Sequence, residues 1–484
     1  MPLHWVGRGL ALVIVLVLVA SATSLTLAYD PPDLEPGSVD KSANGTTIVA
    51  VQGFHFKGQY DKKKPARLVG LGPDANVSWV YDGSKRGASW FYDTDPLPNG
   101  DLLAVNTMQV YGVGGQTVVY RLDPETKERV WEARLDLTDT HDVDLINGDQ
   151  LLVANMRRWN ATAGVSNDRL ILYDISPILN GSRDQVTEED IVWEWHFKDH
   201  YPAWTDEGMN DDWTHVNDVD KIGPGRYMVS VRNFDQVIVV DRSTDEIDRQ
   251  LGADGNLGVL YEQHNPTYLE TADGKPTILV ADSENDRVVE YTCTETAGGD
   301  CEWELVWEVG KDQLNWPRDA DRLPNGNTLI VDSMGHRVVE VTPSGRIVWE
   351  AYVPWSPYDV ERMPYGDEGR AASNLPTMLD LNASGFYNLT GSAGLAPGTR
   401  GGKQTFPQWL ETTFGRTPIG GPVVSFAELW ESGAQWIKPV WMAPWAFVHL
   451  ASAVLVTLFW AIGELVYHRR RLRHAVGRAV ARLG

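Results

Sequence analysis

The chain has 484 residues, 43% of them hydrophobic, which is too long for one small domain and normal for a protein with a packed core. Its formal net charge is −24 at pH 7, and the six arginines beyond residue 468 have no acidic neighbour, so the rest is more acidic still. Such acidity argues against nucleic acid as a partner and fits a surface kept soluble in high salt, as in a halophilic source. An ordinary acidic secreted protein is the alternative.

Two apolar segments lie near the ends of the chain. The first, within residues 1–29, has an uncharged run long enough to cross a bilayer, so we predict a transmembrane anchor, with a cleavable signal peptide as the alternative. Residues 30–46 are rich in Pro, Gly and acidic residues and are expected to be a linker. The second, residues 441–467, precedes the basic tail 468–484, which the positive-inside rule keeps in the cytoplasm. We therefore expect a cell-membrane protein with both termini cytoplasmic and an extracellular domain between them.

A four-strand unit repeats between these segments and is clearest at Asn315–Glu350. Its alternating apolar runs are separated by Asn-Gly and Ser-Gly turns, which predict hairpins because glycine reaches positive φ without steric cost. Four antiparallel strands over about 35 residues are typical of one β-propeller blade. Units of this kind begin near residues 93, 142, 218, 265 and 319. Asp-x-Asp marks the start of each except the looser copy near 265, and Val-Trp-Glu marks the end of each except the unit near 218, where Ile247–Gly252 takes its place.

A sixth blade has to be assembled from both ends of the repeat region. Tyr358–Glu361 reads like a first strand with no blade after it. Three unassigned strands precede the first unit, at Thr47–Gly53, Ala66–Gly72 and Val77–Asp82. The sequence therefore predicts an all-β fold, a six-bladed β-propeller over residues 47–363, with N- and C-terminal transmembrane helices. Residues 364–440 are expected to be a partly helical packing segment, with an active-site lid as the alternative.

Cysteine and asparagine patterns also suggest an external location. Cys293 and Cys301 predict a disulfide at a hairpin tip in an oxidising compartment, with two unrelated thiols as the alternative. Asn-X-Ser/Thr sequons, the acceptor sites of glycoproteins, begin at Asn44, Asn76, Asn160, Asn180, Asn382 and Asn388.

Propeller geometry predicts which side chains meet at the central channel. The starts of the first strands and the turns between second and third strands lie on one face, and three blades bring His141, His215 and His264 there. The same positions supply amides and guanidinium groups at Asn217, Arg232, Asn233, Arg287 and Arg318. Guanidinium groups bind sulfate or phosphate oxygens, and a neutral imidazole acts as base or nucleophile.

We therefore predict a site for a compact oxyanion that uses neither a metal nor a cofactor. The Asp-x-Asp pairs are expected to accept backbone hydrogen bonds, and the histidine spacing does not resemble a dedicated metal cage, although a histidine-bound metal is an alternative. A glycine-rich phosphate loop before a helix is missing from the sequence, which argues against a nucleotide.

The order of the motifs over residues 90–360 resembles the arylsulfotransferase (arylsulfate sulfotransferase) family of six-bladed propellers. The resemblance rests on HisValAsnAspValAsp at 215–220, GlnHis at 263–264 with AspArg at 286–287, and GlyArgIleValTrpGlu at 345–350. It implies sulfuryl transfer from one phenolic sulfate to another phenol, without a nucleotide donor, through a sulfated histidine. It also implies that His215, His264 and Arg287 bind and polarise the sulfate.

One position departs from that family. Its nucleophilic histidine begins the strand after the disulfide, where this sequence has Arg318 in AsnTrpProArgAsp. We expect an arylsulfotransferase-like protein acting on a small aromatic sulfate or phenol, in which His264 or His141 replaces that nucleophile. The alternatives are a non-catalytic surface propeller that binds a glycan, protein or anion, and a metal-dependent lactonase-like or lyase-like propeller.

Overall fold

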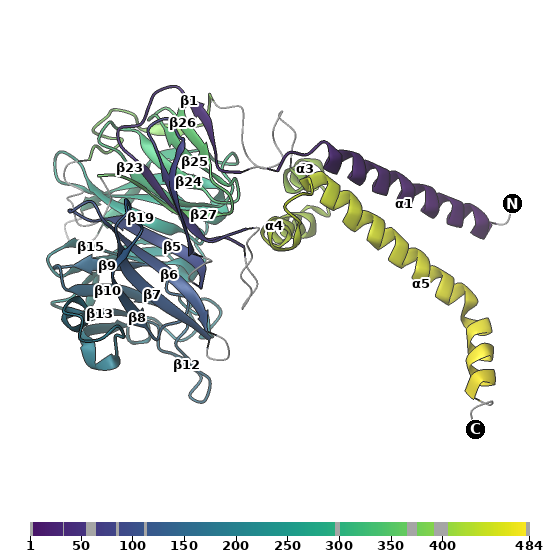
Figure 1. Cartoon of the computed structure of the whole chain (residues 1–484), viewed down its shortest axis with the longest axis horizontal. Helices are drawn as coiled ribbons and strands as arrows, with labels where there is room; N and C mark the ends of the chain where they lie inside the picture. Colours follow the sequence, from purple (N-terminus) through teal and green to yellow (C-terminus); the bar gives the residue numbers. More distant parts are fainter. Residues whose placement is uncertain are drawn as a thin grey trace. The chain divides into compact units, whose positions relative to one another are not determined.

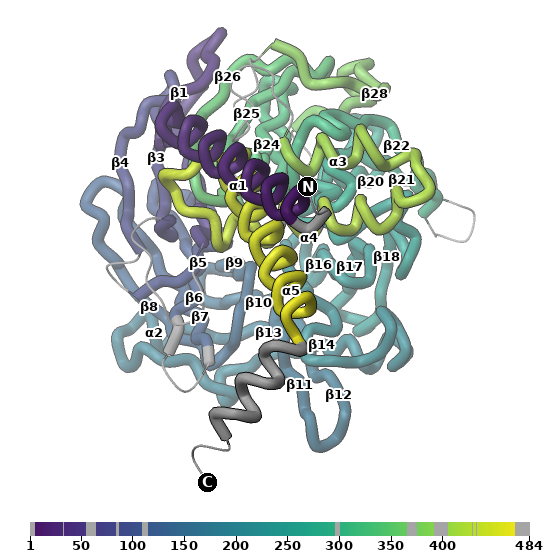
Figure 2. The backbone as a smooth tube through the Cα atoms, turned by 90° about the vertical axis from the view of Figure 1, so that its right-hand side faces the viewer, coloured from purple at the N-terminus to yellow at the C-terminus, as the bar shows by residue number. Residues whose placement is uncertain are grey.

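The computed structural model describes residues 3–31, 33–54, 64–83, 87–110, 114–295, 301–364, 375–391 and 405–480. The chain forms two compact units, one of residues 32–396 and one of residues 1–31 with 397–484. The larger unit is a propeller whose six blades surround a central axis (Figure 2). The smaller unit is helical (Figure 1). The predicted six-bladed, mainly β fold is confirmed.

Each blade is an antiparallel meander of four strands. The first three blades, each from the innermost strand outwards, are β27 (Pro357–Arg362), β2 (Thr47–Val51), β3 (Arg67–Leu71) and β4 (Val77–Asp82); β5 (Ala88–Pro96), β6 (Leu102–Val110), β7 (Gly114–Leu122) and β8 (Arg129–Leu135); and β9 (Val143–Ile146), β10 (Gln150–Asn155), β13 (Arg169–Asp174) and β14 (Ile191–His196). The other three are β15 (Val216–Gly223), β16 (Arg226–Val231), β17 (Gln236–Asp241) and β18 (Glu246–Gly252); β19 (His264–Glu270), β20 (Pro276–Asp282), β21 (Arg287–Glu295) and β22 (Cys301–Val309); and β23 (Pro317–Arg322), β24 (Thr328–Asp332), β25 (Arg337–Val341) and β26 (Ile347–Tyr352).

The first blade closes the ring, because it combines one strand from the C-terminal side with three from the N-terminal side. β27 pairs with β2, with Val360 opposite Val49, as the sequence predicted. Closure of this kind completes the first blade, which packs against the last through a shared core that includes Val49 and Val331.

Short strands outside the meanders extend two outer edges. β1 (Glu35–Val39), in the stretch expected to be a linker, pairs with β26, and β28 (Gly385–Tyr387) lies parallel to β22. A small hairpin of β11 (Trp159–Asn160) and β12 (Val165–Ser166) projects from the third blade, and the short helix α2 (Ser176–Leu179) follows β13.

The hydrophobic core is divided into clusters, each between two successive blades. Leu152 and Leu172 of the third blade, for example, pack against Val229 and Val240 of the fourth, and all four are fully buried. Each side chain of this size contributes about 1.5–3 kcal/mol when it is fully buried. The alternating apolar residues of every strand therefore join neighbouring blades.

The tryptophan of the recurring Val-Trp-Glu motif ties one blade to the next. Trp307 Nε1 donates to the carbonyl oxygen of Pro343 at 2.9 Å, and Trp349 Nε1 donates to that of Pro73 at 2.9 Å. In both pairs the acceptor lies in the turn between the third and fourth strands of the following blade. The indole thus buries its ring and satisfies its one donor at the same boundary.

The aspartates of the Asp-x-Asp pairs join neighbouring inner strands. The amide nitrogen of Val219 donates to Asp142, and that of Val360 donates to Asp319 Oδ2 at 2.8 Å. In the fifth blade Thr267 replaces the aspartate, and its hydroxyl donates to the carbonyl oxygen of Ala320 at 3.1 Å. As predicted, these pairs accept backbone hydrogen bonds, and the donors belong to the adjacent blade.

The predicted disulfide is confirmed. Cys293 in β21 and Cys301 in β22 are bonded, with their Cα atoms 5.2 Å apart. The bond links the two strands at the tip of the fifth blade's outer hairpin.

The smaller unit contains two long apolar helices, α1 (Leu3–Leu27) and α5 (Pro444–Val480), which run side by side in opposite directions (Figure 1). Arg8 Nε donates to Glu464 Oε1 at 2.6 Å near one end of the pair, and Ala22 packs against Ala446 near the other. The stretches Trp5–Leu27 and Pro444–Arg469 are long and apolar enough to cross a membrane. The helices are therefore compatible with membrane anchoring.

Two further helices precede α5, as the sequence predicted for a partly helical segment. They are α3 (Phe406–Phe414) and α4 (Gly420–Ile437). Thr405 caps the first, since its side chain accepts a hydrogen bond from the amide nitrogen of Gln408 at 3.3 Å.

Candidate functional site

The candidate site lies where the inner strands begin, and β-bulges direct its side chains toward the channel. The residue immediately before the recurring aspartate falls at a shift in strand register in four blades, at Tyr92, Asn217, Arg318 and Tyr358. A bulged residue is left out of the strand ladder, so its side chain is turned away from the regular alternation. In the third blade the same position is held by His141.

His141 is buried, and both of its ring nitrogens face protein groups. The Tyr358 hydroxyl lies 2.9 Å from Nδ1, and Asp139 Oδ1 lies 3.8 Å from Nε2. The ring of Tyr92 lies against the imidazole with 3.9 Å between centroids, and its hydroxyl donates to Asp139 at 2.7 Å. Burial lowers the pKa of His141, against the opposing effect of Asp139, so the imidazole is held neutral.

His215 begins the fourth blade in a left-handed backbone conformation, with φ of +41°. Its Nδ1 lies 2.9 Å from Asp212 Oδ1, so Nδ1 carries the proton and Nε2 keeps its lone pair. Within the described residues Nε2 has no hydrogen-bond partner. Burial, and next the charge of Arg232, hold the pKa of His215 well below its usual value. The ring centroid lies 5.2 Å from that of His141.

His264 begins the fifth blade and also presents Nε2. Its Nδ1 lies 2.8 Å from Ser283 Oγ and 3.1 Å from the carbonyl oxygen of Glu262. Ser283 donates its own proton to the carbonyl oxygen of Pro317 at 2.6 Å, so His264 Nδ1 is the donor in the contact with the hydroxyl. Burial, and then the charge of Arg318, place the pKa of His264 well below its usual value.

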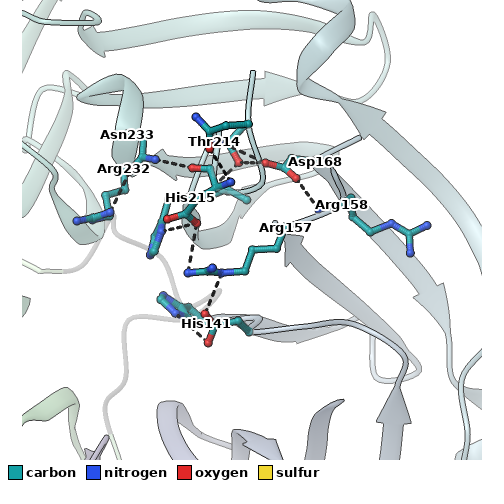
Figure 3. Close-up of polar contacts among 12 residues, drawn as sticks. His141, Arg157, Arg158, Asp168, Thr214, His215, Arg232 and Asn233 are labelled. Carbon is teal, nitrogen blue, oxygen red and sulfur yellow. Dashed lines mark hydrogen bonds and ion pairs between the residues drawn. The ribbon is translucent and has the colours of Figure 1, made fainter. Parts of the chain in front are cut away.

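Three arginines lie among these imidazoles, and they differ in how their charges are paired. Arg157 bridges two carboxylates, with Nε 3.0 Å from Asp139 and Nη2 3.3 Å from Asp212 (Figure 3). Arg232 forms an ion pair with Glu262.

Arg318 is the least paired of the three. Its Nη1 donates to Gln52 Oε1 at 2.7 Å, and its guanidinium carbon lies 4.0 Å from the ring of Trp316 and 4.6 Å from that of Tyr358. It forms no ion pair with a carboxylate of the described residues, and its buried Nε has no hydrogen-bond partner there. Burial lowers the pKa of Arg318, yet the group remains a cation at neutral pH.

The structure brings together His141, His215, His264, Arg232 and Arg318, as ring contacts and charge effects among them show. Together with Tyr358, which touches two of the imidazoles, they form a cluster of neutral ring nitrogens around an incompletely paired guanidinium. Such a cluster can donate hydrogen bonds to an oxyanion and offer lone pairs to an electrophile.

The two predicted amides lie beside this cluster and support its backbone. Asn233 Nδ2 donates to the carbonyl oxygen of Asp212 at 2.6 Å, and Asn217 Nδ2 donates to that of Gln263 at 3.0 Å. Asn217 Oδ1 is buried and has no hydrogen-bond partner among the described residues.

Arg287 is placed in the blade instead of at the channel. Its guanidinium donates to Asp282 and Glu308, each at 2.6 Å, and to two carbonyl oxygens. Arg337 of the next blade repeats this arrangement with Asp332 and Glu350. Because all its donor nitrogens are occupied, Arg287 has nothing left to offer a ligand.

The sequence analysis did not single out Tyr92, Asp139, Asp212 and Tyr358. The two tyrosines could have been found, because each stands directly before the recurring aspartate, as His141 and Arg318 do. The two carboxylates lie in irregular loops, and no repeat marks them, whereas Arg157 follows the second strand of its blade, at a position where channel-facing side chains were expected. In the described part of the chain no group of three or more His, Cys, Asp or Glu side chains is arranged to hold a metal ion.

Residues 97–302 match the family model described as Arylsulfotransferase (ASST). The resemblance that the motifs predicted is thus confirmed for this segment. The matched segment includes His141, His215 and His264, and it ends before Arg318 and Tyr358.

Solved structures that this chain is similar to are distant in sequence. A protein of unknown function from Bacteroides caccae is 11% identical, with a TM-score of 0.41, covering 66% of this chain and 98% of that one. A putative 6-phosphogluconolactonase from Bacteroides fragilis is 11% identical, with a TM-score of 0.40, covering 66% and 97%. These similarities do not indicate a function. The search of curated proteins found no match.

Proposed function

We propose that this protein is an arylsulfotransferase-like enzyme that transfers a sulfuryl group from an aryl sulfate to a phenol at the histidine and arginine cluster. The observation that carries the proposal is Arg318, a buried guanidinium with spare donors, facing neutral imidazoles. A sulfate ester supplies oxygens for the guanidinium and an electrophilic sulfur for a ring nitrogen.

The proposed binding mode assigns separate parts of the ligand to separate groups. Arg318 and Arg232 bind the sulfuryl oxygens, and the rings of Trp316 and Tyr358 line the place of the aryl group. His141, His215 and His264 are the catalytic candidates. Arg287 is left out of this proposal because its donors are already used within the fifth blade.

The proposal is tested by incubating the purified protein in high salt with 4-nitrophenyl sulfate and a phenol acceptor. Transfer is measured as release of 4-nitrophenol together with formation of the sulfated acceptor, detected by mass spectrometry. We expect transfer by the wild type and its loss in a double variant, His215→Gln with His264→Gln. Wild-type protein that binds the aryl sulfate but sulfates no acceptor contradicts the enzymatic proposal.

A second candidate function is non-catalytic binding of an anionic ligand by a surface propeller. It is favoured by the arginine at position 318, where the resembling family has its nucleophilic histidine. This candidate predicts saturable binding of aryl sulfates without turnover, so the same incubation separates the two.

For location we propose a cell-membrane protein in which α1 and α5 cross the bilayer and the propeller is outside. The basic residues after the second span support a cytoplasmic C-terminus. Single cysteines at exposed Trp204 in the propeller and at Arg482 in the tail, tested with a membrane-impermeant thiol reagent on intact cells, check this topology. Labelling of the tail cysteine in intact cells contradicts it.

A further inference from the structure

The geometry points to Nε2 of His215 as the atom that attacks sulfur, with Asp212 and Arg157 as the residues that position it. This inference rests on the proposed sulfuryl transfer and assigns its nucleophile. It differs from what the family resemblance implies, which is that the residue at 215 only binds and polarises the sulfate.

The hydrogen bonds reduce three candidate histidines to two. His141 has Tyr358 on one nitrogen and Asp139 facing the other, so no ring nitrogen is free to attack. His215 and His264 each use Nδ1 as a donor to the protein, and Nε2 of each has no hydrogen-bond partner within the described residues. Only these two can present a lone pair without first breaking a protein contact.

The charge that develops on the ring separates His215 from His264. When Nε2 bonds to sulfur the imidazole becomes cationic, and a carboxylate on Nδ1 then stabilises the product and the transition state that leads to it. Asp212 lies 2.9 Å from Nδ1 of His215. On His264 the Nδ1 proton meets only a hydroxyl and a carbonyl oxygen.

Arg157 connects this dyad to the neighbouring blade. It contacts Asp212 on the loop before the fourth blade and Asp139 on the loop before the third (Figure 3). Asp168 holds the backbone on both sides, since it accepts from the amide nitrogen of Arg158 at 2.9 Å and from that of Thr214 at 3.3 Å. Arg157 thus fixes the orientation of the carboxylate that orients His215.

The reaction balances without an oxidant, reductant or metal. The lone pair on His215 Nε2 attacks sulfur, the bond from sulfur to the aryl oxygen breaks, and the phenolate leaves and takes a proton from solvent. In the second half the oxygen of the acceptor phenol attacks sulfur and its proton passes to Nε2 of His264. The nitrogen–sulfur bond breaks with its electron pair returning to His215, and His264 releases its proton to solvent.

Mapping the sulfuryl group on the wild-type enzyme tests the assignment without any variant. Protein mixed with 4-nitrophenyl sulfate and no acceptor is quenched in alkali, digested, and sequenced by mass spectrometry. We expect the added sulfuryl group on His215 and a burst of 4-nitrophenol. A sulfuryl group on His264 or His141, or transfer without a trapped intermediate or burst, overturns the inference while leaving the proposed function intact. Absence of any transfer by the wild type contradicts the proposed function itself.

Variants then test the positioning residues by a measurement that a purely structural role would not change. Asp212→Asn should slow the burst by at least about 100-fold, as expected when a carboxylate that orients a catalytic imidazole is neutralised, while the apparent Kd for the aryl sulfate stays close to that of the wild type. Arg157→Lys should recover part of the burst rate lost in Arg157→Met, because lysine restores the charge between the two carboxylates.

Thermal unfolding shows whether each variant is folded. Rescue by added imidazole tests His215 itself. Added imidazole should restore 4-nitrophenol release in His215→Gly but not in His264→Gly. Rescue of His264→Gly alone, or equal burst rates in Asp212→Asn and wild type, refutes the assignment.

Discussion

Replacing Arg318 with methionine tests how much anion affinity depends on one guanidinium. Arg318 makes one hydrogen bond, to Gln52, and has no carboxylate partner in the described residues, so its remaining donors are open to a ligand. Charge-assisted hydrogen bonds to an oxyanion in a buried site contribute about 2–4 kcal/mol. We therefore expect the Kd for 4-nitrophenyl sulfate to rise by about 30- to 1,000-fold in Arg318→Met.

The same substitution should change stability little. Burying the cation costs several kcal/mol, whereas its two contacts with aromatic rings contribute about 0.5–2 kcal/mol each and its hydrogen bond about 1.5–3 kcal/mol. The opposing contributions are similar in size. The free energy of unfolding of Arg318→Met should thus stay within about 1.5 kcal/mol of the wild-type value.

Arg287→Met is the matched control, because it removes a guanidinium of similar burial that is fully paired within its blade. It leaves Asp282 and Glu308 unpaired and should lose about 3–5 kcal/mol of unfolding free energy. Affinity is measured by calorimetry and stability by urea unfolding of the whole protein. Our interpretation of Arg318 fails if a folded Arg318→Met binds the aryl sulfate as tightly as wild type, or if it is destabilised as much as Arg287→Met.

Three other predictions follow from the same structure. Burial depresses the pKa of His215 and His264, so both imidazoles stay neutral below pH 6.5 and transfer should continue into that range, as a pH–rate profile checks. The same two histidines bind protons more readily in the unfolded chain, so the free energy of unfolding should fall as the pH drops below 6.5. Urea unfolding at several pH values measures that fall. Replacing Cys293 and Cys301 with serine should lower the unfolding free energy by about 2–3 kcal/mol and leave transfer unchanged, because the bond closes a short loop far along the outer hairpin. Gly345→Ala should lower the free energy of unfolding by about 1–3 kcal/mol, since φ is +78° and a Cβ atom would lie 2.4 Å from the carbonyl oxygen of Asn388. Circular dichroism during urea titration measures this loss, and an unchanged unfolding midpoint contradicts the prediction.

The fold was predictable because its information is local and repeated. Gly-containing turns, Asp-x-Asp and Val-Trp-Glu recur at blade spacing, and the unmatched strands at the two ends of the repeat region combine into one more four-stranded blade. The three histidines were predictable for the same reason, since each stands at the start of a repeated strand.

The remaining site residues depend on distances that a one-dimensional pattern does not contain. Arg157 belongs to one blade and holds carboxylates from two loops, and Tyr358 reaches His141 from the opposite end of the repeat region. For Arg287 a sequence motif was present but gave the wrong location. The motif that places this arginine at the site in the resembling family also occurs where an arginine forms an ion pair inside a blade. Its likeness to Arg337 was visible in the sequence, but the acidic partner Glu308 lies on another strand.

The bulge before the recurring aspartate explains how the chemistry of the channel mouth can change while the fold is kept. The aspartate holds the next inner strand through a backbone amide, as Asp319 does with Val360, so the spacing of the strands does not depend on the residue before it. That preceding position holds tyrosine, histidine, asparagine or arginine in different blades with the same four-stranded pairing. Arg318 thus places a positive charge at a position whose side chain the strand pairing does not constrain. An arginine there adds an anion-binding group and, in our proposal, leaves the attack on sulfur to His215, whose loop already carries the carboxylate that the role requires.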